Sequence, residues 1–199
     1  VTGVQTCALP ILEGMSAFVD LQYRHVNYTM QDPNDSYGSN ADGKYIIDDD
    51  FNFFNPKFGI NYDFLPGQRL YISYAIAHRE PTRNDYEDNL DTKMKSERLN
   101  DLEVGYKYQS KTFSAGANFY YMDYKDQFVL TGELNNIGEA IAKNVGSSYR
   151  MGVELEAAWM PVDWFRWDAN ATWSKNRAKD WTITDNDGDL CNLGDTPLS

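Results

Sequence analysis

The chain has 199 residues and a formal charge of −12 at pH 7, because 30 Asp and Glu outnumber 18 Lys and Arg. Such an acidic chain repels the phosphates of DNA and RNA, which argues against nucleic acid as a partner. The longest apolar run, residues 7–12, is far shorter than the ~18 residues of a membrane-spanning helix. Transmembrane strands remain open, because every second residue in them is polar.

The N-terminal residues 1–11 have the sequence VTGVQTCALPI, which follows no strand pattern. They also lack the basic start and the long apolar core of a secretory signal. We therefore expect residues 1–11 to be a non-native or irregular segment, and residues 12–199 to belong to one domain. Because the chain stops within a polar loop, we expect it to be a piece of a larger sheet.

Seven segments alternate apolar and polar residues, which predicts strands with one apolar face, and the aromatic content of 15% also favours strands. Phe18 interrupts the polar side of the first segment. Pro56 removes a backbone donor from the second, and we expect it at the outer entry of that strand. In chain order the segments are residues 15–23, 54–64, 69–76, 101–108, 113–121, 148–159 and 165–174.

The connections between these segments alternate in length. The short turns are residues 65–68, 109–111 and 161–164. The long polar connections are residues 25–52, 77–100 and 129–143, and a further loop opens at Arg177. Short turns at one end of a sheet and long loops at the other are typical of outer-membrane β-barrels.

A soluble β-sandwich would show the same alternation. The predicted strands, however, are about twice the ~5–6 residues usual in globular sheets and match the ~9–11 residues that cross a bilayer. We therefore predict an all-β, antiparallel up-and-down transmembrane barrel, of which this chain supplies about seven strands. The alternative is a soluble cell-surface β-sandwich with a binding or structural role. The barrel places four side chains against lipid that the sandwich would bury, namely Leu70, Tyr106, Val153 and Trp167.

Five stretches in this order carry a family resemblance: FNPKFGINYDF (54–64), YAIAHREPTR (74–83), ERLNDLEVGYK (97–107), NFYYMDYKD (118–126) and GVELE (152–156). The series resembles the TonB-dependent outer-membrane receptors, particularly those of Bacteroidetes. Two positions depart from the family pattern, since Ser96 stands where Pro is usual and Leu102 where Tyr is common.

The resemblance implies a barrel of about 22 strands with a plug domain inside it, in the bacterial outer membrane. It also implies import of a large, scarce nutrient, energised by the TonB complex through the plug domain, which this chain lacks. The ligand expected is a ferric chelate (siderophore), with haem, cobalamin and glycans as alternatives. The other partners expected are outer-membrane lipid and lipopolysaccharide, and no cofactor or enzymatic activity is implied.

Charged residues on the polar side of the strands would point into the lumen, because a charge on an apolar face is costly. We expect them to wet the channel and to hold the plug. These predicted wall residues are Arg69, Glu103, Lys107, Arg150, Glu154 and Arg166. In the long connection 77–100, Arg79, Arg83 and Tyr86 are candidates for contact with an anionic chelate.

Asp185, Asp187 and Asp189 have the spacing of the first three ligands of a calcium loop. Leu190 and Thr196 stand where such a loop needs Gly and Glu, so a weak Ca2+ site competes with a solvated acidic loop. The two histidines are 53 positions apart and have no nucleophile at a suggestive spacing. We therefore predict no catalytic residues.

Overall fold

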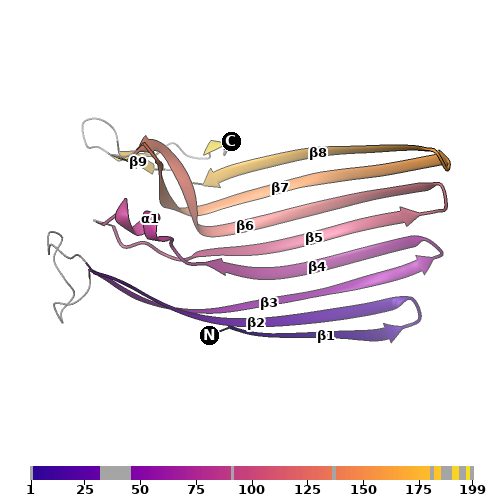
Figure 1. The fold of residues 1–199 in the computed structure, drawn as a ribbon, viewed down its shortest axis with the longest axis horizontal. Coiled ribbons are helices and arrows are strands. Elements are labelled where there is room, and N and C mark those ends of the chain that lie inside the picture. The colour runs from indigo at the N-terminus through magenta and orange to yellow at the C-terminus, as the bar shows by residue number, and fades with distance from the viewer. Residues whose placement is uncertain are drawn as a thin grey trace.

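The computed structural model describes residues 2–31, 46–90, 92–135, 138–179, 182–184, 190–192 and 196–197. These residues form a nine-stranded antiparallel sheet in which β1 to β8 follow one another in chain order and β11 lies beside β8 (Figure 1). The predicted up-and-down order is confirmed. Tight turns lie at one end of the sheet and long connections at the other. No helix among these residues is long and apolar enough to span a membrane.

The bounds of the strands show how far each one extends. The large sheet contains β1 (Thr2–Leu12), β2 (Met15–Met30), β3 (Ile47–Leu65), β4 (Gln68–Arg79), β5 (Glu97–Gln109), β6 (Phe113–Leu134), β7 (Ala140–Val162), β8 (Phe165–Lys179) and β11 (Thr196–Pro197). A separate pair joins β9 (Thr182–Thr184) to β10 (Leu190–Asn192), and the helix α1 (Arg83–Glu87) lies between β4 and β5.

One row in the middle of the sheet shows how the sequence builds the apolar face. Ile72 of β4 lies directly opposite Ile60 of β3 and Val104 of β5. The row continues through Phe119 of β6 to Val153 of β7. Opposed residues project to the same face, so alternation within each strand becomes one apolar surface across the sheet.

The exposure of this face decides between the two predicted folds. Leu70, Val153 and Trp167 are 46%, 38% and 53% exposed, and Tyr106 is half-buried on the same side. A sandwich would bury these residues under a second sheet. None of the residues that the structure describes covers this apolar surface, which spans seven strands and needs lipid around it, so the barrel prediction is confirmed and the soluble sandwich is wrong.

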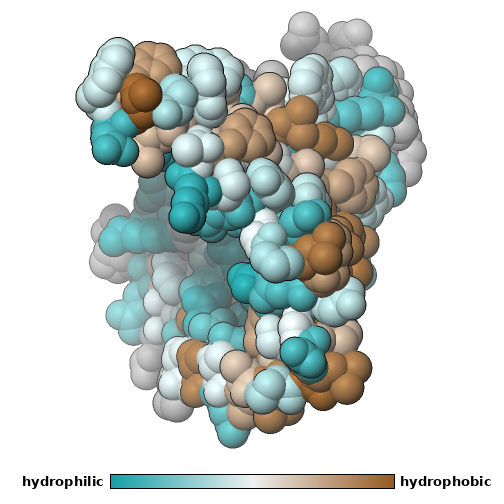
Figure 2. Space-filling model, turned by 90° about the vertical axis from the view of Figure 1, so that its right-hand side faces the viewer, coloured by the Kyte–Doolittle hydropathy of each residue, from teal (hydrophilic) through white to brown (hydrophobic). Residues whose placement is uncertain are grey.

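The opposite face is polar and lines a hollow. One of its rows runs from Asn61 through Tyr71, Gly105 and Asn118 to Glu154. Figure 2 looks at the sheet from its tight-turn end, with hydrophilic residues gathered in the hollow and hydrophobic residues on the outer side. The sheet therefore has one apolar and one polar face, as the outer and inner surfaces of a barrel wall require.

Several glycines on the polar face lie opposite a large side chain. A Cβ atom on Gly59 would come within 2.6 Å of the ring of Phe18, its direct partner across the strands. Phe18 therefore interrupts the polar pattern because its ring covers the space above a glycine, as aromatic residues do in other sheets. Tyr71 covers Gly105 in the same way.

The strands are longer than predicted at the end with the long connections. The segment predicted as a loop over residues 129–143 is instead mostly strand, since β6 reaches Leu134 and β7 begins at Ala140. Polar residues there still pair through their backbones, although they no longer alternate with apolar ones. Pro56 lies in the middle of β3 rather than at its entry, and pairing with β4 stops beside it, at Lys57.

The sequence predicts a non-native or irregular segment over residues 1–11; the backbone of residues 2–11 is regular, and the non-native origin stays a prediction. Thr2–Leu12 forms the edge strand β1, which is paired with β2 in register from Thr2 to Pro10. Every side chain of β1 is exposed, so no burial imposes an alternating pattern on its sequence. Gly14, in a left-handed conformation, makes the tight turn between β1 and β2. The outer edge of β1 offers unpaired N–H and C=O groups to any extended segment.

Replacing Gly67 by Ala is expected to weaken the β3–β4 turn. Gly67 has a φ of +73°, and a Cβ atom there would lie 2.1 Å from the carbonyl oxygen of Gln109. The left-handed conformation alone should cost about 1–2 kcal/mol. Urea unfolding of the protein in detergent should show a lower midpoint for Gly67→Ala. Gly146→Ala is the control, because no atom beyond its two chain neighbours lies within 4 Å of its added methyl group, and equal midpoints for the two variants would contradict this account.

Candidate functional site

The candidate site is the hollow polar face of the sheet, which forms the inner wall of the barrel. One end of this face lies near the tight turns, and the other end, called the mouth below, lies near the long connections. At the wall, Asp63 and Arg69 face one another across β3 and β4 and form two hydrogen bonds of 2.7 and 2.9 Å. On β8, the guanidinium of Arg166 donates to the carboxylate of Asp168 at 2.8–3.1 Å. Both pairs are half exposed and add little to stability.

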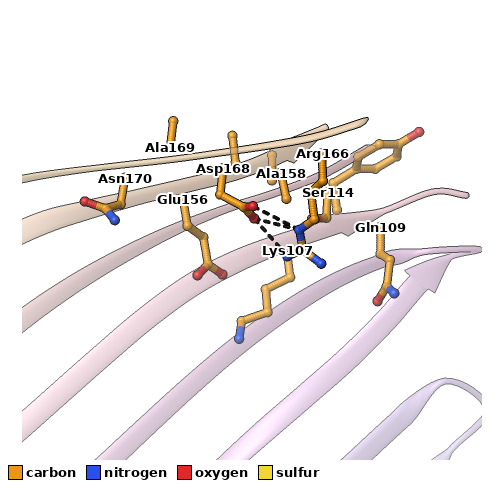
Figure 3. Close-up of a pocket in the computed structure, with 12 residues that line it drawn as sticks. Lys107, Gln109, Ser114, Glu156, Ala158, Arg166, Asp168, Ala169 and Asn170 are labelled. Carbon is orange, nitrogen blue, oxygen red and sulfur yellow. Dashed lines mark hydrogen bonds and ion pairs between the residues drawn. The ribbon is translucent and has the colours of Figure 1, made fainter. Parts of the chain in front are cut away.

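A depression of about 440 Å3 lies on this wall between β5, β6, β7 and β8. Lys107 of β5 and Glu156 of β7 reach into it from either side of β6, and the ion pair of Arg166 with Asp168 forms one side (Figure 3). Its other polar lining residues include Gln109, Ser114 and Asn170. Such a surface is hydrated and charged, as expected for the inner wall of a large barrel.

Three glutamates lie near one another around Tyr71. The charges of Glu103, Glu156 and Glu154 all act on the Tyr71 hydroxyl, which donates a 2.9 Å hydrogen bond to Asn118. None of the three carboxylates is in an ion pair within the described part of the chain. Lys107 lies in the same region, so this part of the wall carries more acidic than basic groups.

All six predicted wall residues project to the polar face. Arg69 and Arg166 are in ion pairs, whereas the Lys107 ammonium lies 5.7 Å from the ring centre of Tyr71. Arg150 lies 5.4 Å above the ring of Tyr124. Their placement agrees with the alternation, and their role in holding a plug remains a prediction.

At the mouth, two arginines each lie over an aromatic ring and pair with a glutamate. Arg79 is 4.7 Å above Phe128 and 3.4 Å from Glu97. Arg24 is 5.0 Å above Phe53 and pairs with Glu80. Arg24 was not predicted, because it lies just beyond the alternating segment 15–23, where the charge pattern gives no sign that β2 continues.

The other two loop candidates do not join Arg79 at one surface. The Arg83 side chain is 74% exposed and pairs with Glu87 one helical turn later, and this partner raises the pKa of Arg83. Tyr86 is only 2% exposed, so its ring cannot meet a ligand from solution. The sequence could not reveal this burial, because the partners of Tyr86 come from strands far away along the chain.

The predicted calcium site and the histidine His78 remain to be placed in the structure. Asp185, Asp187 and Asp189 lie outside the described residues, so the calcium site stays a prediction. Among the residues that are described, no group of three metal-ligating side chains occurs. His78 has its Nδ1 atom 2.8 Å from the Asn55 side-chain oxygen, and its ring stacks on Phe53, as expected for a packed wall residue.

Replacing Glu80 by Gln is expected to loosen the mouth at neutral pH but not in acid. Burial raises the pKa of Glu80, but its hydrogen bonds with Arg24 and its own backbone, together with the charges of Arg24 and Arg79, bring the pKa below its usual value. A lowered pKa means that the pair stabilises the fold above the unfolded pKa of about 4.3, and that this stabilisation is lost as pH falls through the folded value.

We expect Glu80→Gln to cost about 1 kcal/mol at pH 7, after allowance for its partial exposure, and nothing measurable at pH 3. Thermal unfolding in detergent at the two pH values measures this difference. Glu87→Gln, which makes the same chemical change in the exposed pair with Arg83, is the control and should have little effect at either pH. A Glu80→Gln cost that is equal at pH 3 and pH 7 would contradict the role given to the charge.

The fold is similar to those of several solved transporters. The FrpB iron transporter from Neisseria meningitidis (F3-3 variant) matches with a TM-score of 0.66 and 20% identity, over 96% of this chain and 27% of that one. The copper transporter OprC matches with a TM-score of 0.74 and 16% identity, over 89% and 28%. The ferric-catecholate import receptor Fiu from E. coli K12 matches with a TM-score of 0.58 and 18% identity, over 94% and 30%. The chain therefore spans less than a third of each of these proteins.

None of the curated proteins matches the chain in sequence. The family described as "TonB dependent receptor-like, beta-barrel" matches residues 16–198, nearly the whole chain. The predictions of a TonB-dependent receptor barrel, of an outer-membrane location and of a protein that is not an enzyme are confirmed by this family assignment. With its antiparallel meander, apolar outer face and polar hollow, the chain belongs to the β-barrel family of the TonB-dependent receptors.

Proposed function

We propose that the chain is part of the wall of a receptor that binds a ferric chelate at its outer mouth and imports it with energy from TonB. The observation that carries the proposal is the arrangement of two arginine side chains at the mouth. Arg79 and Arg24 are held there beside aromatic rings and on the polar side of the sheet. Guanidinium groups over aromatic rings suit ligands that are both anionic and planar.

The names of similar structures support the same class of ligand. They include an iron transporter, a ferric-catecholate import receptor and a receptor for alcaligin. The copper transporter OprC shows that a barrel of this kind also occurs in a protein with another cargo. A ferric chelate is therefore the first ligand to test and copper the second.

The lower part of the hollow suits contact with a plug domain. Glu103, Glu154 and Glu156 lack ion-pair partners among the described residues, and basic groups of a plug would neutralise them. The plug in turn would carry the contact with TonB. Lipid and lipopolysaccharide are the partners proposed for the apolar outer face.

The test is uptake of radiolabelled ferric chelates, copper and cyanocobalamin, each measured separately, by the complete receptor, with its reading frame recovered from the source DNA and expressed in a host that lacks its own ferric receptors. We expect uptake of ferric enterobactin or ferric alcaligin, and no uptake when the host lacks TonB. Arg79→Ala should weaken binding about tenfold, or about 1.4 kcal/mol, and Arg79→Lys somewhat less. Uptake of copper or cyanocobalamin with no uptake of either ferric chelate would overturn the proposed ligand class.

A further inference from the structure

The connection between β4 and β5 is folded against the polar face at the outer end of the sheet. It is described over residues 80–90 and 92–96 and contains α1. Thr82 begins the helix in a capping box, in which its hydroxyl accepts from the backbone N–H of Asp85 and the Asp85 carboxylate accepts from that of Thr82. The segment thus has local structure of its own, although it is short.

The first attachment of this segment is made by Tyr86. Its ring stacks on Tyr28 with the ring centres 4.9 Å apart and the planes 7° from parallel. Its hydroxyl donates a 2.8 Å hydrogen bond to Asp49, which lies directly opposite Tyr28 in the β2–β3 hairpin. Burial and the Asp49 carboxylate raise the pKa of Tyr86, so the phenol remains a donor at any physiological pH.

The second attachment is made by two asparagines and joins the segment to β7. The side-chain amide of Asn89 donates to the carbonyl oxygens of Asp85 at 2.8 Å and of Ala142 on β7 at 3.0 Å. Asn144 on β7 accepts from the backbone N–H of Lys95 at 2.9 Å and donates to the carbonyl oxygen of Lys95 at 3.0 Å. It also donates to a carbonyl oxygen of β6 at 2.7 Å.

These two attachments lie on strands that are not neighbours. Between β3 and β7 stand β4, β5 and β6, and both attachments lie on the hollow side of the curved sheet. The segment lies at the end of the sheet opposite the tight turns (Figure 1), and its contacts with Asp49 on β3 and Ala142 on β7 join the two ends of this arc. Breaking either attachment would expose a buried side chain, Tyr86 in one case and Asn89 in the other.

We propose that residues 80–90 and 92–96 form a fixed strut across the outer mouth of the lumen, and that Tyr86 is its positioning residue. The strut sets the width of the mouth, and cargo passes beside it rather than displacing it. Arg83 is carried on the strut, and Arg79 immediately precedes it. The inference rests on the proposed function only in assuming that cargo enters through this mouth.

Hydrogen–deuterium exchange of the complete receptor in its membrane tests the strut without any ligand. The amides of Asp88, Asn89 and Lys95 are hydrogen-bonded, so peptides covering them should exchange at least about 100-fold more slowly than an unstructured chain. Tyr86→Phe should speed this exchange about tenfold. Glu87→Gln, on the same helix but outside both attachments, should leave it unchanged. Exchange of the wild-type segment at the rate of an unstructured chain would overturn the proposal.

A cross-link distinguishes a fixed strut from a lid. Cysteines replacing Asn89 and Ala142, in a protein with Cys7→Ser and Cys191→Ser, would tie the segment to β7 through a disulfide or a short thiol cross-linker. We expect the linked receptor to take up ferric enterobactin within about twofold of the unlinked one. Loss of uptake that a reductant restores would show a lid and overturn the strut. If neither form takes up the ferric chelates or copper, the proposed function fails, while the exchange experiment still decides the strut.

Discussion

Replacing Ile72 by Arg will prevent the barrel from assembling or strongly destabilise it. Ile72 lies in the central apolar row, opposite both Ile60 and Val104, and its side chain is 46% exposed on the outer face. Near the middle of a bilayer, an outward Arg costs about 2–4 kcal/mol. The folded band in unheated gel electrophoresis of outer membranes should be reduced several-fold, and the urea midpoint of the remaining folded protein should fall.

Ser73→Arg is the matched control, because it introduces the same group one residue later on the other face. Ser73 lies opposite Gly59 and Glu103, so the new guanidinium enters a hydrated hollow beside a carboxylate. We expect folded protein at the wild-type level. Equal losses for the two variants would show that the two faces are not distinguished by lipid, which contradicts the barrel wall.

Replacing Gly105 by Val is expected to cost about 1–3 kcal/mol, in the range of overpacked sites. A Cβ atom at this position would lie 2.2 Å from the ring of Tyr71. The ring would have to rise from the wall into the lumen, and its hydrogen bond to Asn118 would be lost. Urea unfolding in detergent measures the effect on the wall.

A double-mutant cycle with Tyr71→Ala isolates the cause. If the ring and the valine compete for one space, Gly105→Val should cost much less in the Tyr71→Ala background, with a coupling of about 1–2 kcal/mol. Additive losses in the cycle would mean that the valine acts elsewhere, on the strand backbone itself. Gly146→Ala again serves as the control, since no atom beyond its two chain neighbours lies within 4 Å of its added methyl group.

The sequence predicted the sheet well wherever one face meets lipid. Alternation from residue 54 to residue 64 specifies which side chains turn outward, because a slip of one residue would move charges such as Lys57 and Asp63 into the apolar face. The same logic placed Arg69, Lys107 and Arg150 on the polar face. The family resemblance then supplied the larger architecture.

Beyond the apolar band the sequence is a poorer guide. β2, β3, β6 and β7 continue past the alternating segments as backbone pairing that no burial pattern marks. Tyr86 looked like an exposed loop aromatic, but its partners Tyr28 and Asp49 are dozens of residues away in the chain. Phe18 interrupts the apolar–polar alternation of β2, and the sequence of β2 alone does not explain why. The reason is Gly59 on the neighbouring strand, because the Phe18 ring covers the space above it.

The central claim is that one face of this sheet meets lipid and the other meets water, and electron paramagnetic resonance tests it most directly. Spin labels would be placed singly at Ile72, Val104 and Val153, and at their neighbours Ser73, Glu103 and Glu154, in the complete receptor in lipid bilayers. The account predicts that the first three labels collide mainly with oxygen dissolved in the hydrocarbon. It predicts no such preference for the second three, which face the lumen. Equal access of a water-soluble nickel chelate to both sets would contradict the barrel wall.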